Sequence, residues 1–292
     1  MAEKIKEYLD YLSIEKGYSQ GTVNAYAYDV NKFLSFLPKE SQSDITKQHA
    51  INYFNFLANK GYRKRNDKTT RARRLSSINS YFRFLLKEDY IKTNPIEGIK
   101  APKLDKKEPS YLSEAEYLGL LKAIGTHATS YYSLRDFAII KLFLTTGLRL
   151  AELTGMDISD VNLKDNAIQI IRKGRKEQTL PINQETAKAI KMYLGSRKDK
   201  SEALFISRKK SRISKGAVTY LVKKYMKKAG ICNKKLSPHT LRHSFCTALL
   251  NKGVNIAVIQ ELAGHSSMDT TRRYIHLNNS DLREAINQLK TD

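Results

Sequence analysis

Residues 237–274 concentrate side chains that can act on a phosphate group. This segment contains His239, Arg242, His265 and Tyr274, although the whole chain has only six histidines. Arginine offers a planar fork of donors that fits phosphate oxygens. Histidine can act as a base, and an activated tyrosine can serve as a nucleophile. The segment therefore indicates a phosphate-handling site.

His239 and Arg242 follow Ser237 and Pro238, a typical helix cap and first-turn residue. Because they are three residues apart, both side chains should share one face at a helix start, where backbone N–H groups can also meet a phosphate. A zinc site is the alternative, since His239 and His243 are four residues apart. The zinc-protease pattern needs glutamate after the first histidine, and threonine stands there, so we expect no metal and no cofactor.

Two basic residues and one acidic residue upstream are further candidates. Arg149 follows the glycine that ends an apolar helix, where it can reach a site, but it can equally well pair with Glu152. Lys173 precedes a hairpin glycine, and on local grounds an ordinary turn lysine is the simpler interpretation. His265 and Tyr274 are also unremarkable alone, as a histidine after a helix and one of 17 tyrosines.

Taken together, the order and spacing of these residues resemble the tyrosine recombinase family, which includes phage integrases and Xer recombinases. The segments that carry the resemblance are TGLRLAEL, SPHTLRHSF, LAGHSSMDTT and YIH, and it covers nearly the whole chain. The positions that match the family's catalytic residues are Arg149, Lys173, His239, Arg242, His265 and Tyr274.

The resemblance implies a site that neutralises a phosphodiester without metal. Arg149 and Arg242 would bind the non-bridging oxygens, because guanidinium groups stay charged and offer paired donors. His265 would donate a further hydrogen bond to the scissile phosphate. Glu152 would orient its neighbours.

The resemblance also implies covalent catalysis. Tyr274 would be the nucleophile; since its ordinary pKa is ~10, it needs help to lose its proton, from His239 as base and Arg242 electrostatically. Lys173, on a hairpin that DNA could bring into place, would protonate the leaving 5′ oxygen. The 3′-phosphotyrosine product would keep the bond energy, so that strands rejoin without ATP through a four-way junction.

The elements that must position these residues indicate a mainly α-helical chain of two domains. Residues 1–100 have apolar positions at helical spacing and predict four helices, a core-binding domain of the SAM-like kind according to the resemblance. Residues 101–112 are rich in charge and contain two prolines, which predicts an extended linker. Residues 113–292 then form the catalytic domain. The four helices are expected over about residues 5–12, 19–34, 46–57 and 67–85.

In the second domain, Ser113 and Glu116 form a capping box that begins a helix. The apolar run from Ser133 to Gly147 predicts a buried central helix. Residues 167–182 alternate in β fashion around a turn and predict a hairpin, which a strand over 203–207 could extend into a three-stranded sheet. Further helices are expected over about residues 183–195, 214–229, 238–252, 255–262 and 280–290.

The formal net charge of +23 implies a polyanionic partner, and nucleic acid is the leading candidate. No run approaches ~18 apolar residues and no signal peptide is visible, so we expect no membrane contact and a cytoplasmic location. The two cysteines lack metal or disulfide spacing. A dense group of bases could be a solvated helix face, but we favour DNA contact. Its members are Arg63, Lys64, Arg65, Lys68, Arg71, Arg73 and Arg74.

The sequence therefore predicts a site-specific DNA recombinase, with a type IB topoisomerase or a non-catalytic DNA-binding protein as alternatives. Expected partners are double-stranded DNA with paired recombinase sites and three further copies in a homotetramer, with a partner recombinase or accessory protein also possible. Leu282, Ile286 and Leu289 form an apolar face that either packs on its own domain or docks on a neighbour, which we favour. Chromosome dimer resolution and integration of a mobile element both remain open. Core-binding helices at the start favour an Xer-like or compact integrase.

Overall fold

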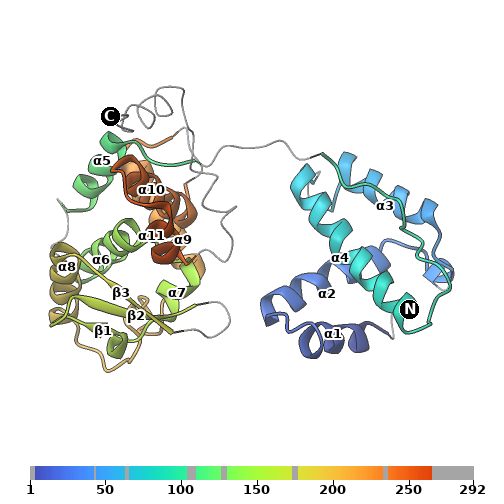
Figure 1. Cartoon of the computed structure of the whole chain (residues 1–292), viewed down its shortest axis with the longest axis horizontal. Coiled ribbons are helices and arrows are strands. Elements are labelled where there is room, and N and C mark those ends of the chain that lie inside the picture. Colours follow the sequence, from blue (N-terminus) through green and yellow to red (C-terminus); the bar gives the residue numbers. More distant parts are fainter. Residues whose placement is uncertain are drawn as a thin grey trace, which may run out of the picture. The chain divides into compact units, whose positions relative to one another are not determined.

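The structure is a computed structural model, and it describes residues 4–42, 44–62, 66–103, 110–125, 130–172, 177–232 and 236–264. The chain divides into two compact units, Met1–Lys106 and Lys107–Asp292 (Figure 1). Both are mainly helical, and the second contains a small three-stranded antiparallel sheet, so the predicted fold class is confirmed. Several predicted features lie outside the described residues. They are the helix expected over 280–290 and the site candidates Arg63, Lys64, Arg65, Lys173, His265 and Tyr274.

The first unit contains the four predicted helices. Ser19 and Asp67 cap two of them, because each side chain accepts a hydrogen bond from a backbone N–H three residues later. The apolar faces meet in one core around Phe33, Tyr53 and Phe82. The elements are α1 (Ile5–Ile14), α2 (Gln20–Leu34), α3 (Lys47–Asn59) and α4 (Lys68–Lys87), with a short 3-10 helix, Lys39–Gln42.

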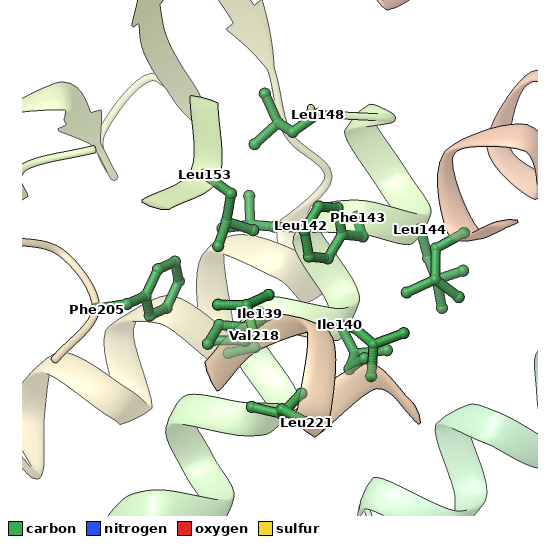
Figure 2. Close-up of a cluster of buried hydrophobic side chains, with 14 of the residues drawn as sticks. Ile139, Ile140, Leu142, Phe143, Leu144, Leu148, Leu153, Phe205, Val218 and Leu221 are labelled. Atoms are coloured by element: carbon green, nitrogen blue, oxygen red, sulfur yellow. The ribbon is translucent and has the colours of Figure 1, made fainter. Parts of the chain in front are cut away.

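The second unit is built around α6 (Tyr131–Thr146), the predicted buried helix, which begins at the cap Ser130 rather than at Ser133. Its apolar side chains lie in the core shown in Figure 2, together with residues from α7, α9 and the 203–207 segment. Helices α8 and α10 pack against it. The other helices are α5 (Glu114–Gly125), α7 (Leu150–Gly155), α8 (Gln184–Gly195), α9 (Lys215–Lys228), α10 (Pro238–Asn251) and α11 (Ile256–Ala263).

The predicted capping box at the start of α5 is present. The Ser113 backbone N–H donates to Glu116 Oε2 at 2.7 Å, and the Glu116 N–H donates to Ser113 Oγ at 3.3 Å. Helix α7 is not among the predicted helices, because six residues are too few to show a helical period. No helix among the described residues is long and apolar enough to span a membrane.

The sheet has the order β1-β2-β3, with β1 at Val161–Asn162, β2 at Ala167–Ile171 and β3 at Glu177–Pro181. The hairpin β2–β3 is confirmed, with Ile168 opposite Leu180. The prediction that residues 203–207 supply the third strand is wrong, because β1 occupies that edge of β2. The 203–207 segment forms only isolated bridges, and its backbone bonds to Met156 and Ile213 instead.

Candidate active site

Helix α7 carries the first candidate arginine at its N-cap. Gly147 ends α6 in a left-handed conformation (φ 61°), which turns the chain so that Arg149 can begin α7. The Arg149 backbone N–H donates to Glu152 Oε2 at 2.7 Å, and its Nη1 donates to Oε1 at 2.8 Å. Its Nη2 reaches the Gly264 carbonyl. The Arg149 guanidinium therefore pairs with Glu152 and also bonds to the end of α11.

Helix α10 carries the second arginine and the first histidine. Pro238 occupies the first turn as expected, but the side chain of Ser237 makes no cap hydrogen bond to the helix. His239 is exposed, whereas Arg242, one turn later, is buried. The Arg242 guanidinium donates to the carbonyl oxygens of Gly147 and Ala263. It therefore links the end of α6 to the end of α11.

The carboxyl end of α11 brings the two arginines together. The helix ends at Gly264, which has a left-handed backbone (φ 62°). The carbonyl of Ala263 accepts from Arg242, and the next carbonyl, that of Gly264, accepts from Arg149. A helix carboxyl end carries partial negative charge, so it stabilises cations. Two guanidinium groups from distant parts of the chain thus meet one residue before His265.

The pKa of Arg242 reflects, first of all, how deeply its guanidinium is buried. Burial lowers the pKa of its guanidinium from the ordinary 12.5 to about 10, and the positive charge of Arg149 acts in the same direction. Arg242 still carries its charge at neutral pH. A buried cation held by carbonyl groups is suited to bind an anion, because little water screens the attraction.

A third arginine, Arg172, belongs to this cluster and is absent from the predicted site. It follows β2, is buried, and donates to Glu152 and to the carbonyls of Leu262 and Ala263. Burial lowers its pKa, and the carboxylate of Glu152 partly opposes that effect. The signal is present in the alternation of β2, because Ile168 and Ile170 point inward and residue 172 continues that face.

The DNA-binding candidates on α4 divide into two groups. Lys68 is exposed and Arg71 is half-buried at the start of the helix. Arg73 pairs with Asp29, which is fully buried, and Arg74 is itself buried with its Nε 3.7 Å from the same carboxylate. Arg74 also donates to the Tyr53 hydroxyl at 2.9 Å. This geometry favours an internal role for Arg74 rather than the DNA contact that we expected.

Of the six catalytic candidates, the structure thus brings Arg149 and Arg242 together and places His239 at the start of the helix that carries Arg242. Lys173 and His265 lie outside the described residues, but the residues directly before them do not. Arg172 donates to carbonyls only one and two residues before Gly264. Within the described ranges, no group of three His, Cys, Asp or Glu side chains could hold a metal ion.

Comparison with known proteins agrees with this geometry. Residues 110–281 match the model of the phage integrase family, and residues 5–89 match the phage integrase N-terminal SAM-like domain. The tyrosine recombinase XerC of Caldanaerobacter subterraneus subsp. tengcongensis is 36% identical over 312 residues, covering 97% of this chain and 86% of the relative.

Two crystal structures share the fold. XerH recombinase bound to a palindromic difH substrate in a post-cleavage complex has a TM-score of 0.74 at 23% identity, covering 98% of this chain and 84% of that chain. A lambda integrase tetramer bound to a Holliday junction has a TM-score of 0.74 at 21% identity, covering 94% and 76%.

The two family models together match most of the chain, one in each compact unit. The chain belongs to the phage integrase family of tyrosine recombinases and is a site-specific DNA recombinase. The topoisomerase and the non-catalytic DNA-binding protein are not favoured, because the curated relative is a recombinase over nearly the whole chain.

Proposed function

We propose that this recombinase cleaves and rejoins duplex DNA through a 3′-phosphotyrosine formed on Tyr274. The observation that carries the proposal is the meeting of Arg149 and Arg242 at consecutive carbonyl groups at the end of α11. His265 follows the second of these carbonyls directly in the chain, and Tyr274 follows nine residues later. The two arginines that would bind the scissile phosphate therefore meet directly before the segment of the chain that contains both residues.

The two arginines act as a phosphate clamp. Negative charge increases on the non-bridging oxygens as the phosphorus is attacked, and fixed guanidinium groups stabilise that charge more in the transition state than in the ground state. Glu152 holds Arg149 through both its backbone and its side chain. These two bonds hold the Arg149 side chain in position before DNA binds.

The remaining residues move protons or hold the phosphate. Tyr274 attacks the phosphorus, and His239 accepts its proton. Lys173 protonates the leaving 5′ oxygen, because an alkoxide is too basic to leave unaided near neutral pH. His265 donates a hydrogen bond to a non-bridging oxygen. The bond energy stays in the phosphotyrosine, so a 5′ hydroxyl of another strand can reverse the step without ATP or metal.

Each domain has its own role in binding. Residues 1–100 form the core-binding domain, residues 101–112 the linker and residues 113–292 the catalytic domain, so that duplex DNA is held by both. The basic residues of the first domain bind the backbone without reading sequence. Those that remain candidates for DNA contact are Arg63, Lys64, Arg65, Lys68, Arg71 and Arg73.

Strand exchange requires two duplexes, and we propose a homotetramer on DNA in which each C-terminal tail docks on a neighbour. The crystallised lambda integrase tetramer on a Holliday junction supports this arrangement by its shared fold. Chromosome dimer resolution, which the Xer-like resemblance implies, and integration of a mobile element are the two roles that this proposal includes. A second recombinase or an accessory protein, and a cytoplasmic location, are part of the same proposal.

The test begins with the DNA sites that the protein occupies. A Tyr274→Phe protein, cross-linked in its native cell, should be enriched at one or a few chromosomal sequences. A nicked duplex of that sequence, incubated with wild-type protein without metal or ATP, should give an adduct that resists denaturation. Tyr274→Phe should bind the duplex and form no adduct. An adduct that persists in this variant contradicts the assignment of the nucleophile.

A further inference from the structure

Arg172 is an extensively bonded side chain beside the arginine clamp, and the reaction described above gives it no role. Its Nε donates to Gln178 Oε1 on β3 at 2.8 Å. Its Nη1 lies 3.3 Å from each carboxylate oxygen of Glu152 and donates to the Ala263 carbonyl at 3.0 Å. Its Nη2 donates to the Leu262 carbonyl at 2.7 Å. One guanidinium therefore joins the hairpin, α7 and α11.

The Arg172 side chain is almost fully buried, and only 8% of it is exposed. A charged group is buried at a cost unless its donors are satisfied, and here every nitrogen has a partner. Because Arg172 is not among the positions that match the family's catalytic residues, we argue its role in the reaction through the groups that it holds.

Those groups are the partners of the clamp. Glu152 bonds to Arg149 through two hydrogen bonds and to Arg172 through its other contacts. The Ala263 carbonyl accepts from both Arg172 and Arg242. Arg172 thus touches one partner of each clamp arginine without occupying the phosphate-binding position of either.

Gly264 shows how closely Arg172 and the end of α11 are fitted. A Cβ at residue 264 would lie 2.6 Å from the guanidinium carbon of Arg172, well inside van der Waals contact. The positive φ of Gly264 disfavours a side chain there as well. Gly264, directly before His265, therefore packs closely against Arg172, which directly precedes Lys173.

We infer that Arg172 is a positioning residue that holds Arg149, through Glu152, and Arg242, through the Ala263 carbonyl, in the geometry that the scissile phosphate requires. This inference rests on the proposed function, because it assigns Arg172 to the same reaction. A displacement of the clamp by about 1 Å lowers a reaction rate about 100-fold even when the ligand still binds. Loss of Arg172 therefore affects the chemical step far more than DNA affinity.

Arg197 provides a matched control. It is also a buried arginine, with 5% of its side chain exposed, and it pairs with Asp199 and donates to the carbonyls of Ser201 and Ala203. None of these partners bonds to Arg149 or Arg242 in the part of the chain that the structure describes. Its removal reproduces the general effect of deleting a buried arginine without touching the clamp.

The experiment compares the full-length wild type with Arg172→Ala, Arg172→Lys and Arg197→Ala on the nicked cognate duplex. We measure DNA affinity, the single-turnover rate of adduct formation and the midpoint of thermal unfolding. Arg172→Ala should cleave about 100-fold more slowly with affinity changed less than about threefold. Arg172→Lys keeps the charge but cannot reach all partners, so it should lose about tenfold. It also serves if the alanine variant does not fold.

A neutral methylphosphonate at the cleaved position separates positioning from general weakening. The clamp matters less when the phosphate carries no charge, so the rate ratio of wild type to Arg172→Lys should approach one on this substrate. Equal ratios on both substrates, or an equal loss in Arg197→Ala, overturn the inference. A wild type that forms no adduct at all overturns the proposed function as well, which distinguishes the two failures.

Discussion

Arg172 and Arg242 donate hydrogen bonds to the same backbone carbonyl oxygen, that of Ala263. Two cations share this acceptor, and a third, Arg149, bonds to the next carbonyl. Glu152 is the carboxylate that pairs with Arg149 and Arg172, so positive charge remains in excess. The repulsion between these cations is relieved when an anion binds, which favours a phosphate at this point.

The low pKa of Arg242 predicts a pH-dependent variant. The environment that lowers the pKa of the arginine from 12.5 to about 10 should act in the same direction on a lysine. Lysine has an ordinary pKa of ~10.4, so in Arg242→Lys the pKa of the amine should be lowered from that value by the same burial. A base loses its charge as pH rises above its pKa, so cleavage by this variant should decline at a lower pH than cleavage by the wild type.

The measurement is the rate of adduct formation between about pH 6 and 10 on the nicked cognate duplex, because a pH–rate profile reports the titration of an essential group. Wild type is the control, because its arginine stays charged until the pH nears its pKa of about 10. Arg242→Ala should lose cleavage at every pH while it retains most DNA affinity. A lysine variant that follows the wild-type profile contradicts the prediction.

Glu152 should stabilise the second unit strongly. Only 5% of its side chain is exposed, and it faces two arginines. Its replacement by alanine leaves a buried cation cluster without a counter-charge, so the free energy of unfolding should fall by about 3 kcal/mol. Urea denaturation measures this change. Glu15→Ala, which removes an exposed pair with Lys87, is the control and should have little effect.

Gly147 should tolerate no side chain. Its φ is 61°, and a Cβ would collide with the ring of Phe245 on α10. Its carbonyl also accepts from Arg242, so displacement of this turn moves the clamp. Gly147→Ala should lose about 2 kcal/mol of stability together with much of the cleavage rate.

Gly195 is the matched control for this substitution. It is the last residue of α8, and a Cβ there meets no atom within 4 Å. Gly195→Ala should therefore leave both stability and cleavage close to wild type. Thermal unfolding and adduct formation measured on both variants test the pair, and equal losses in the two would contradict the steric argument.

The helices are predictable because their signals are local. Ser19, Asp67 and the Ser113–Glu116 box each act within three residues of a helix start, and all are present. The central helix is recognisable from its continuous apolar run and the glycine that ends it. Such features depend on the sequence of one segment, so no knowledge of tertiary packing is needed.

The arginine cluster is only half predictable, because it depends on contacts between distant segments. Motif resemblance identifies Arg149 and Arg242, but periodicity carries no sign that both bond to the end of α11. Arg172 escapes prediction because a charged residue beside a turn is usually exposed. Charge density alone does not show that Asp29 lies buried beneath Arg74, so sequence alone does not separate Arg74 from its basic neighbours, and its assignment to DNA stays a prediction.

Lys68 and Arg74 should therefore behave differently when replaced by alanine. Lys68 is exposed at the start of α4, so Lys68→Ala should weaken DNA binding and reduce the slope of log affinity against log salt by about 1. Arg74 bonds to Tyr53 and faces Asp29, so Arg74→Ala should lower the free energy of unfolding by about 2 kcal/mol. Salt-dependent DNA titration and urea denaturation of both variants check the contrast. A salt slope that changes only in Arg74→Ala contradicts it.

The C-terminal tail should be needed for assembly but not for binding to one site. Deletion of residues 279–292 removes Leu282, Ile286 and Leu289, whose spacing in the sequence predicts one apolar helix face. If this face docks on a neighbouring copy, the truncated protein should still bind a single duplex, while pairing of two duplexes and resolution of a four-way junction decline. Gel assays of binding, synapsis and junction resolution measure each step. Replacement of Glu284 and Gln288 by alanine on the polar face is the matched control, and normal recombination by the truncated protein would show that the tail packs only on its own domain.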